Sequence, residues 1–187
     1  FSKKRNRLKL LAKEPLIVNN FALGYNLKFA IDSFTNEYNT NTNLFIGYPL
    51  FTECQGTSEQ QATWKTNRAI AYKGSMLQLM RSIFNKTLKE DGFELQFIVD
   101  NNNQEMPIKL GNFYGALNYD KDDSTNTVDI SPNQNEVAII YDKKPEQAYL
   151  DKDSSVKKDF QLSTLLFTPD DPITIEQNGY YYDQEDI

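Results

Sequence analysis

The sequence predicts an α+β fold, a mainly antiparallel sheet with a two-helix hairpin packed on one face. Two observations support this class: apolar residues alternate with period two in several short segments, and the period becomes helical between residues 58 and 90. The order of the segments is three strands, two helices and four further strands. Such an order is typical of α+β domains rather than of alternating α/β folds.

The chain opens with segments that read as strands. Residues 8–18 fit one or two strands, and Pro15 indicates an edge or a break within them. In residues 23–31, LGYNLKFAI, the apolar side chains fall on alternate positions. That alternation is typical of a strand with one face on a core.

A polar connection follows these strands. Residues 36–43 are rich in Asn and Thr and predict a loop or the tip of a hairpin. Residues 44–51, LFIGYPLF, predict a further strand that is interrupted at Gly47 and Pro49.

Two helices are predicted next, at about 58–72 and 76–90, with a tight connection between them. Both starts fit a capping box, Ser58–Gln61 for the first and Ser75–Gln78 for the second. Gly92 is placed to cap the carboxyl end of the second helix.

The second half of the chain reads as strands joined by long polar connections. Asn178-Gly179 is its strongest hairpin signal. Asn/Asp-rich loops are expected at 100–105 and 118–135. Strands are expected at 93–99, 136–142 and 162–167, and on both sides of Asn178-Gly179.

Length and hydrophobic content suit a single domain over residues 1–187, with possible sub-lobes at 1–99 and 106–187. The polar, basic start FSKKRNRLK suggests a fragment of a longer protein. No apolar run approaches the ~20 residues that span a bilayer, so a membrane-spanning protein is not expected. Oligomeric state and strand order are left open.

Composition argues against most catalytic chemistry. There is no histidine, which removes the usual general base and zinc ligand, and Cys54 is the single cysteine. We therefore expect no catalytic residue, no metal site and no cofactor. Residues 1–91 carry 13 Lys+Arg and 7 Asp+Glu, residues 92–187 carry 7 and 19, and the total charge of −6 disfavours nucleic-acid binding.

The acidic segment around Asp120 clusters oxygen ligands of the kind that hold calcium. Counting from Asp120, however, the sixth and twelfth positions hold Thr125 and Ser131, whereas the EF-hand requires Gly and Glu there. The segment therefore reads as a solvated loop.

The stretch WKTNRAIAYKGS places Trp64, Arg68 and Tyr72 four residues apart, on one face of the predicted helix, and Arg81 follows in the next helix. These four residues are the candidate binding site, because aromatic and Arg side chains dominate interaction hot spots. The alternative is structural: Trp64 packs on the sheet and the stem of Arg68 covers it.

The chain also resembles a family of Bacteroidetes envelope proteins, the carboxypeptidase-like regulatory-domain-containing proteins. The likeness is to the region that follows their β-sandwich. The family pattern has a histidine at the position of Gln78, so histidine chemistry is not expected in this member. The resemblance is carried by PLIVNNFALGYNLKFAIDSF, GYPLF, WKTNRAIAYKGS, LMRSIFNKTLKEDGFEL, AIIYDKKPEQAYL, QLSTLLF and NGYYYDQEDI.

What the resemblance implies is a secretory signal upstream and a location in the periplasm, at the outer membrane or on the cell surface. It implies no established substrate. The leading hypothesis is a non-catalytic domain that binds an envelope protein or an extended peptide through a sheet edge or the helical pair. A glycan-binding module is the alternative, and a hydrolase that uses two carboxylates is the third.

Overall fold

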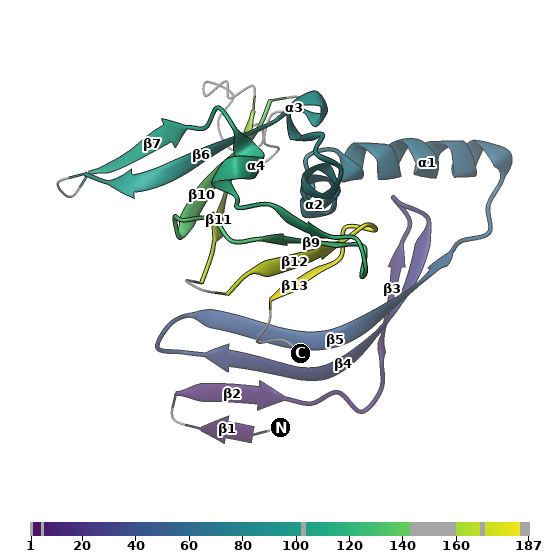
Figure 1. Ribbon diagram of the computed structural model, residues 1–187. Coiled ribbons are helices and arrows are strands. Elements are labelled where there is room, and N and C mark those ends of the chain that lie inside the picture. The colour runs from purple at the N-terminus through teal and green to yellow at the C-terminus, as the bar shows by residue number, and fades with distance from the viewer. Residues whose placement is uncertain (1, 5, 102–103, 143–159, 169–170, 184–187) are drawn as a thin grey trace, which may run out of the picture. The chain divides into compact units, whose positions relative to one another are not determined.

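The computed structural model describes residues 2–4, 6–101, 104–142, 160–168 and 171–183. The chain forms two compact units, Phe1–Ile70 and Ala71–Ile187. The boundary between the units lies in the last turn of the helix Ser58–Tyr72. Antiparallel sheets and short helices make up the described residues (Figure 1), so the predicted α+β class is confirmed.

The first unit is a five-stranded antiparallel sheet and most of helix α1. The strand β4 is central: β2 and β3 pair with its two halves along one edge, and β5 pairs along the whole of the other edge (Figure 1). The elements are β1 (Ser2–Lys4), β2 (Arg7–Leu10), β3 (Leu16–Asn20), β4 (Tyr25–Glu37), β5 (Thr42–Glu53) and α1 (Ser58–Tyr72).

The predicted interruption of β5 is wrong, because the strand runs unbroken through Gly47 and Pro49. A Cβ on Gly47 would lie 2.6 Å from the Ala30 carbonyl oxygen and 2.9 Å from the Phe29 ring. Only glycine therefore lets β4 and its Phe29 ring lie this close to β5. The irregularity lies instead in β4, as a bulge between Ile31 and Ser33.

The second unit contains two four-stranded antiparallel sheets, in the orders β11-β10-β6-β7 and β13-β12-β9-β8. Its helices are α2 (Met76–Asn85), α3 (Leu88–Asp91) and α4 (Phe113–Ala116). Its strands are β6 (Phe93–Asp100), β7 (Glu105–Lys109), β8 (Asp120–Asp122), β9 (Thr127–Ile130), β10 (Glu136–Tyr141), β11 (Gln161–Leu166), β12 (Ile173–Glu176) and β13 (Tyr181–Asp183).

The hydrophobic core belongs to the second unit. Helix α2 supplies one apolar face, the inner positions of β6, β9, β10 and β12 supply most of the rest, and Leu88, Leu117 and Phe167 complete it from α3 and the ends of α4 and β11. The core residues are Leu79, Met80, Ile83, Phe84, Leu88, Phe93, Leu95, Leu117, Val128, Ile130, Val137, Ile139, Tyr141, Phe167 and Ile175.

The predicted second helix, 76–90, is divided in two. Lys86 takes a left-handed conformation, with φ 58°, and ends α2, after which α3 begins at Leu88 and is capped by Gly92. The expected two-helix hairpin is not confirmed, because α1 lies mostly in the first unit and α2 lies in the second.

The expected loop at 118–135 is partly wrong. It contains the strands β8 and β9, because Val128 and Ile130 are buried and β9 pairs with β12. The hairpin at Asn178-Gly179 is confirmed, since it joins β12 to β13 and Gly179 has φ 88°.

Candidate functional site

The predicted binding face of α1 is attached to its own sheet. The Trp64 indole Nε1 donates to the Phe21 carbonyl oxygen at 2.9 Å. One turn later, the Asn67 side-chain amide donates to the Ala22 carbonyl oxygen at 2.8 Å. Two side chains of one helix face therefore satisfy consecutive carbonyls in the turn between β3 and β4.

Arg68 continues this row. Its Nε donates to the Leu23 carbonyl oxygen at 2.7 Å, and its Nη2 donates to the Gly24 carbonyl oxygen at 3.0 Å. Its Nη1 donates to Glu53 Oε1 at 2.8 Å, and the guanidinium lies 3.8 Å from the centre of the Tyr25 ring. The planar group thus joins α1, β4 and β5 through three hydrogen bonds and a cation–π contact.

Two glycines make room for the indole of Trp64. A Cβ on Gly24, where φ is 67°, would lie 2.2 Å from the indole, and a Cβ on Gly56 would lie 2.6 Å from it. Trp64 is half-buried and lines a shallow hollow with Arg68 and Cys54. Because the Trp64 N–H and three of the five Arg68 N–H groups already bind this unit, the face supports the structural alternative, and ligand binding by these residues stays a prediction.

Tyr72 and Arg81, the other two candidates, lie in the second unit. Arg81 Nε donates to the Asn178 carbonyl oxygen at 2.7 Å, and its guanidinium lies 5.6 Å from the Tyr72 ring centre. Arg81 thereby fastens α2 to the β12–β13 hairpin. The structure does not bring the four candidates together at one described site.

Gln78 caps the start of α2. Its backbone N–H donates to the Ser75 Oγ at 3.2 Å, and its side-chain Oε1 accepts from the Gly74 N–H at 2.7 Å. The predicted cap at Ser75 is therefore confirmed, although Gln78 reaches Gly74 instead of Ser75. This buried glutamine acts in helix capping.

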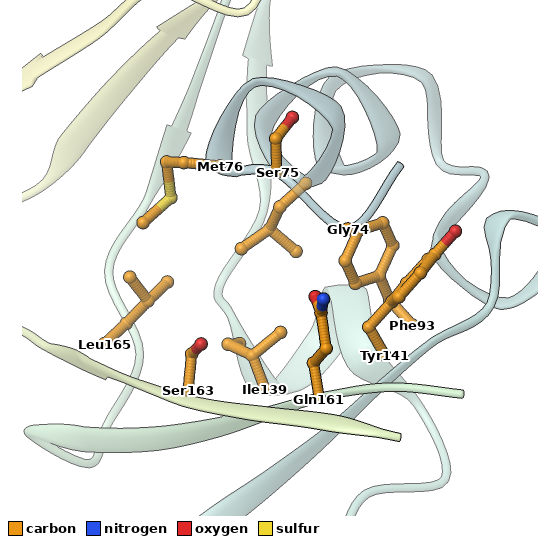
Figure 2. Close-up of a pocket in the computed structure, with 10 residues that line it drawn as sticks. Gly74, Ser75, Met76, Phe93, Ile139, Tyr141, Gln161, Ser163 and Leu165 are labelled. Atoms are coloured by element: carbon orange, nitrogen blue, oxygen red, sulfur yellow. The ribbon is translucent and has the colours of Figure 1, made fainter. Parts of the chain in front are cut away.

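A small hollow lies beside that cap, between the start of α2 and the strands β10 and β11 (Figure 2). Its volume is about 50 Å³, which admits a few water molecules at most. Gly74 borders it, and a Cβ there would meet Gln161 at 2.5 Å and Tyr141 at 2.8 Å. We interpret the hollow as a packing feature of the helix connection.

Three acids line a larger hollow of about 570 Å³: Glu90, Glu94 and Asp142. Lys109 Nζ lies 2.7 Å from Glu94 Oε2, and this hydrogen bond lowers the pKa of Glu94. The general acid of a glycoside hydrolase needs a raised pKa. Glu94 is therefore unsuited to that role.

The acidic segment is engaged internally. The Asp122 carboxylate accepts hydrogen bonds from the Ser124 hydroxyl at 2.6 Å and the Ser124 N–H at 2.7 Å, and these bonds lower its pKa. Lys121 pairs with Asp123 at 3.2 Å. Across the described part of the chain, no three His, Cys, Asp or Glu side chains are grouped to hold a metal ion.

The strand β5 has a free outer edge in the part of the chain that the structure describes, where it pairs with β4 alone. The Cys54 N–H donates inward to the Gly24 carbonyl oxygen at 2.9 Å. Backbone groups alternate in direction along an antiparallel strand, so even-numbered residues of β5 turn inward and odd-numbered residues turn outward. Pro49 occupies an outward position, where its missing N–H costs no bond to β4.

One face of β5 also presents a row of exposed apolar side chains at its even positions. The exposed fractions are 59% for Leu44, 46% for Ile46, 74% for Tyr48 and 63% for Leu50. No charged residue occurs from 38 to 52. Long, uncharged edge strands are the sites at which proteins pair with further strands, and natural edges are normally protected by charge.

Comparison with protein-family models, with curated proteins and with solved structures finds no match to the chain. None of the described helices combines the length and the apolar character that a membrane span requires. The choice of a binding surface therefore depends on the geometry of this chain.

The sequence predicts β5 as a strand but does not show that it is an edge strand. Edge position depends on which strands pair, and pairing over long sequence separation leaves no local signal. One local signal was present: Pro49 in an apolar strand indicates an edge.

Proposed function

We propose that the chain is a non-catalytic interaction domain, and that it binds an extended segment of a protein partner along the outer edge of β5. The observation that carries this proposal is a twelve-residue edge strand with free backbone groups and an uncharged, exposed apolar row. A partner strand would complete the backbone hydrogen bonds and cover the apolar row. The free edge favours this surface over the α1 face, where Trp64, Asn67 and Arg68 already donate to their own unit.

The composition of the first unit supports the same function. Of its described hydrophobic side chains, none is buried, whereas the second unit has a full core. An apolar sheet surface is stabilised when another element covers it. The proposed location is the bacterial envelope, outside the cytoplasm, and it rests on the resemblance in sequence.

The test is capture of partners from an envelope fraction by a matched pair of variants. Leu50 and Ile17 both lie directly opposite Lys28, and they are similarly exposed, at 63% and 66%. Leu50→Glu adds a charge to the β5 edge, whereas Ile17→Glu adds the same charge to β3. Both carboxylates face Lys28, so we expect both variants to fold.

The expected result is that proteins captured by the wild type and by Ile17→Glu are lost with Leu50→Glu. A photo-crosslinking residue at Tyr48 should then mark an extended segment of the partner. Identical captured proteins for all three forms, or none for the wild type, would count against the proposal.

Glycan binding is a second candidate, favoured by one feature of the second unit. Tyr180 and Tyr181, 61% and 42% exposed, border an open hollow with Met76 and Leu77. Exposed aromatic rings of this kind can stack on sugar faces. A glycan array with wild type and Tyr180→Ala tests it, and an array without bound glycans would reject this candidate.

A further inference from the structure

We propose that the segment which fits the β5 edge best is β5 of a second copy of the chain. This inference rests on the proposed function, because it takes the β5 edge as the binding surface. It names the partner and the register. The two copies would pair as antiparallel strands about a twofold axis at Gly47.

The sequence of β5 is nearly symmetric about Gly47. Ile46 and Tyr48 flank it, Leu44 and Leu50 stand three residues away on either side, and threonines stand at five residues. An antiparallel pair centred on Gly47 therefore sets Leu44 of one copy opposite Leu50 of the other. It likewise sets Ile46 opposite Tyr48, so that four apolar cross-strand pairs form on one face.

The hydrogen-bond pattern is compatible with this register. The outward residues of β5 are odd-numbered, and pairing about Gly47 places odd residues opposite odd residues. Gly47 then faces Gly47 of the second copy. Pro49 faces residue 45, so the missing N–H of each proline leaves one bond unmade per copy.

Charge offers no obstacle to self-pairing. The paired strands are uncharged from residue 42 to residue 52, and Glu53 lies beyond the apolar ladder. Like charges directly opposite each other, the usual protection against edge-to-edge pairing, do not occur in this register. A second copy can therefore pair with the free backbone groups of β5 in the same way as a strand of another protein.

Three variants test the register. Leu44→Glu/Leu50→Glu places carboxylates opposite each other in the dimer. Leu44→Lys/Leu50→Glu differs at a single residue and places Lys opposite Glu twice. The control, Ile17→Glu/Asn19→Glu, adds two carboxylates to exposed positions of β3 on the same face.

Sedimentation equilibrium from about 1 to 200 µM measures the association. For the wild type and the control we expect a dimer of about 43 kDa, twice the 21.6 kDa chain. The Glu/Glu form should dimerise at least ~100-fold more weakly, and the Lys/Glu form should recover to within ~10-fold of the wild type. Circular dichroism checks that every variant is folded.

Three results would overturn the inference: a wild-type monomer at every concentration, a Glu/Glu form that dimerises like the wild type, or a Lys/Glu form as weak as Glu/Glu. A monomeric wild type that still loses its captured partners on Leu50→Glu would leave the proposed function intact. In that case a foreign strand, and not a second copy, occupies β5.

Discussion

At the scale of single residues, Arg68 shows how one side chain can organise a unit that lacks a buried apolar core. Three of its five N–H donors bind two carbonyl oxygens and one carboxylate, and its guanidinium plane lies on an aromatic ring. Hydrogen bonds from a charged group are stronger than neutral ones. The row of donors on α1 therefore fixes the turn from which both β3 and β4 extend.

Replacing Arg68 by Ala should destabilise the first unit by about 2–3 kcal/mol, because two carbonyls and Glu53 lose their charged donor. Arg68→Lys should recover only part of this, since an ammonium group cannot reproduce the planar fork. Urea unfolding followed by fluorescence of the single tryptophan, Trp64, reports on this unit.

Lys65→Ala, an exposed neighbour on α1, is the control and should change the unfolding free energy by less than about 0.5 kcal/mol. An Arg68→Ala form as stable as this control would contradict the assignment.

The sequence predicts that Trp64 and Arg68 share one face of a helix. It does not predict what that face contacts. The i, i+4 spacing correctly placed both side chains on one face of α1. Whether a donor points to solvent or to a carbonyl depends on the turn at residues 21–24, which lies more than 40 residues earlier. Gly24 was the available clue in the sequence, because glycine often stands where another group approaches the backbone closely.

At the scale of elements, local patterns predicted the bounds of α1 and the start of α2, and they predicted the strands β5, β6, β10 and β11 to within two residues. They failed where tertiary contacts decide. Lys86 ends α2 in a left-handed conformation that usually favours glycine, and its Nζ lies 4.1 Å from the Tyr119 ring centre. That contact comes from a distant segment and is absent from the local pattern.

The first helix supplies a prediction about caps. The expected box at Ser58 and Gln61 is shifted by one residue: Thr57 Oγ1 accepts from the Gln60 N–H at 3.2 Å, and Gln60 Oε1 accepts from the Thr57 N–H at 2.9 Å. Thr57→Ala should therefore cost about 1 kcal/mol of stability in the first unit. Ser58→Ala should be close to neutral. Urea unfolding of the two variants decides between the two positions, and a larger loss for Ser58→Ala would show that the cap is misplaced.

The strand β5 shows why an edge is hard to recognise from sequence. Its apolar run and its proline were visible, but its partner strands were not. The pairing of β4 with β2 and β3 along its other edge is what leaves β5 outermost among the described strands. Its exposed row reads, in sequence alone, like any half-buried strand.

At the scale of the whole molecule, the two units differ in how they are stabilised. The second is built on a conventional core between α2 and two sheets. The first depends on a sheet, on a row of helix donors and, under the proposed function, on a strand supplied from outside. The uncharged edge strand β5 is the feature of the chain on which the proposed binding function rests.

The most direct test of binding through β5 is amide hydrogen exchange along this strand, measured by NMR in the dilute chain and in its complex. The complex is formed either with a second copy or with the cross-linked partner segment. In the dilute chain, Tyr48 and Leu50 should exchange slowly and Gly47 and Phe51 quickly, because only the even positions bond to β4. In the complex, we expect exchange at Gly47 and Phe51 to slow at least ~10-fold. Unchanged exchange at these two amides in a fully formed complex would contradict binding through the β5 edge.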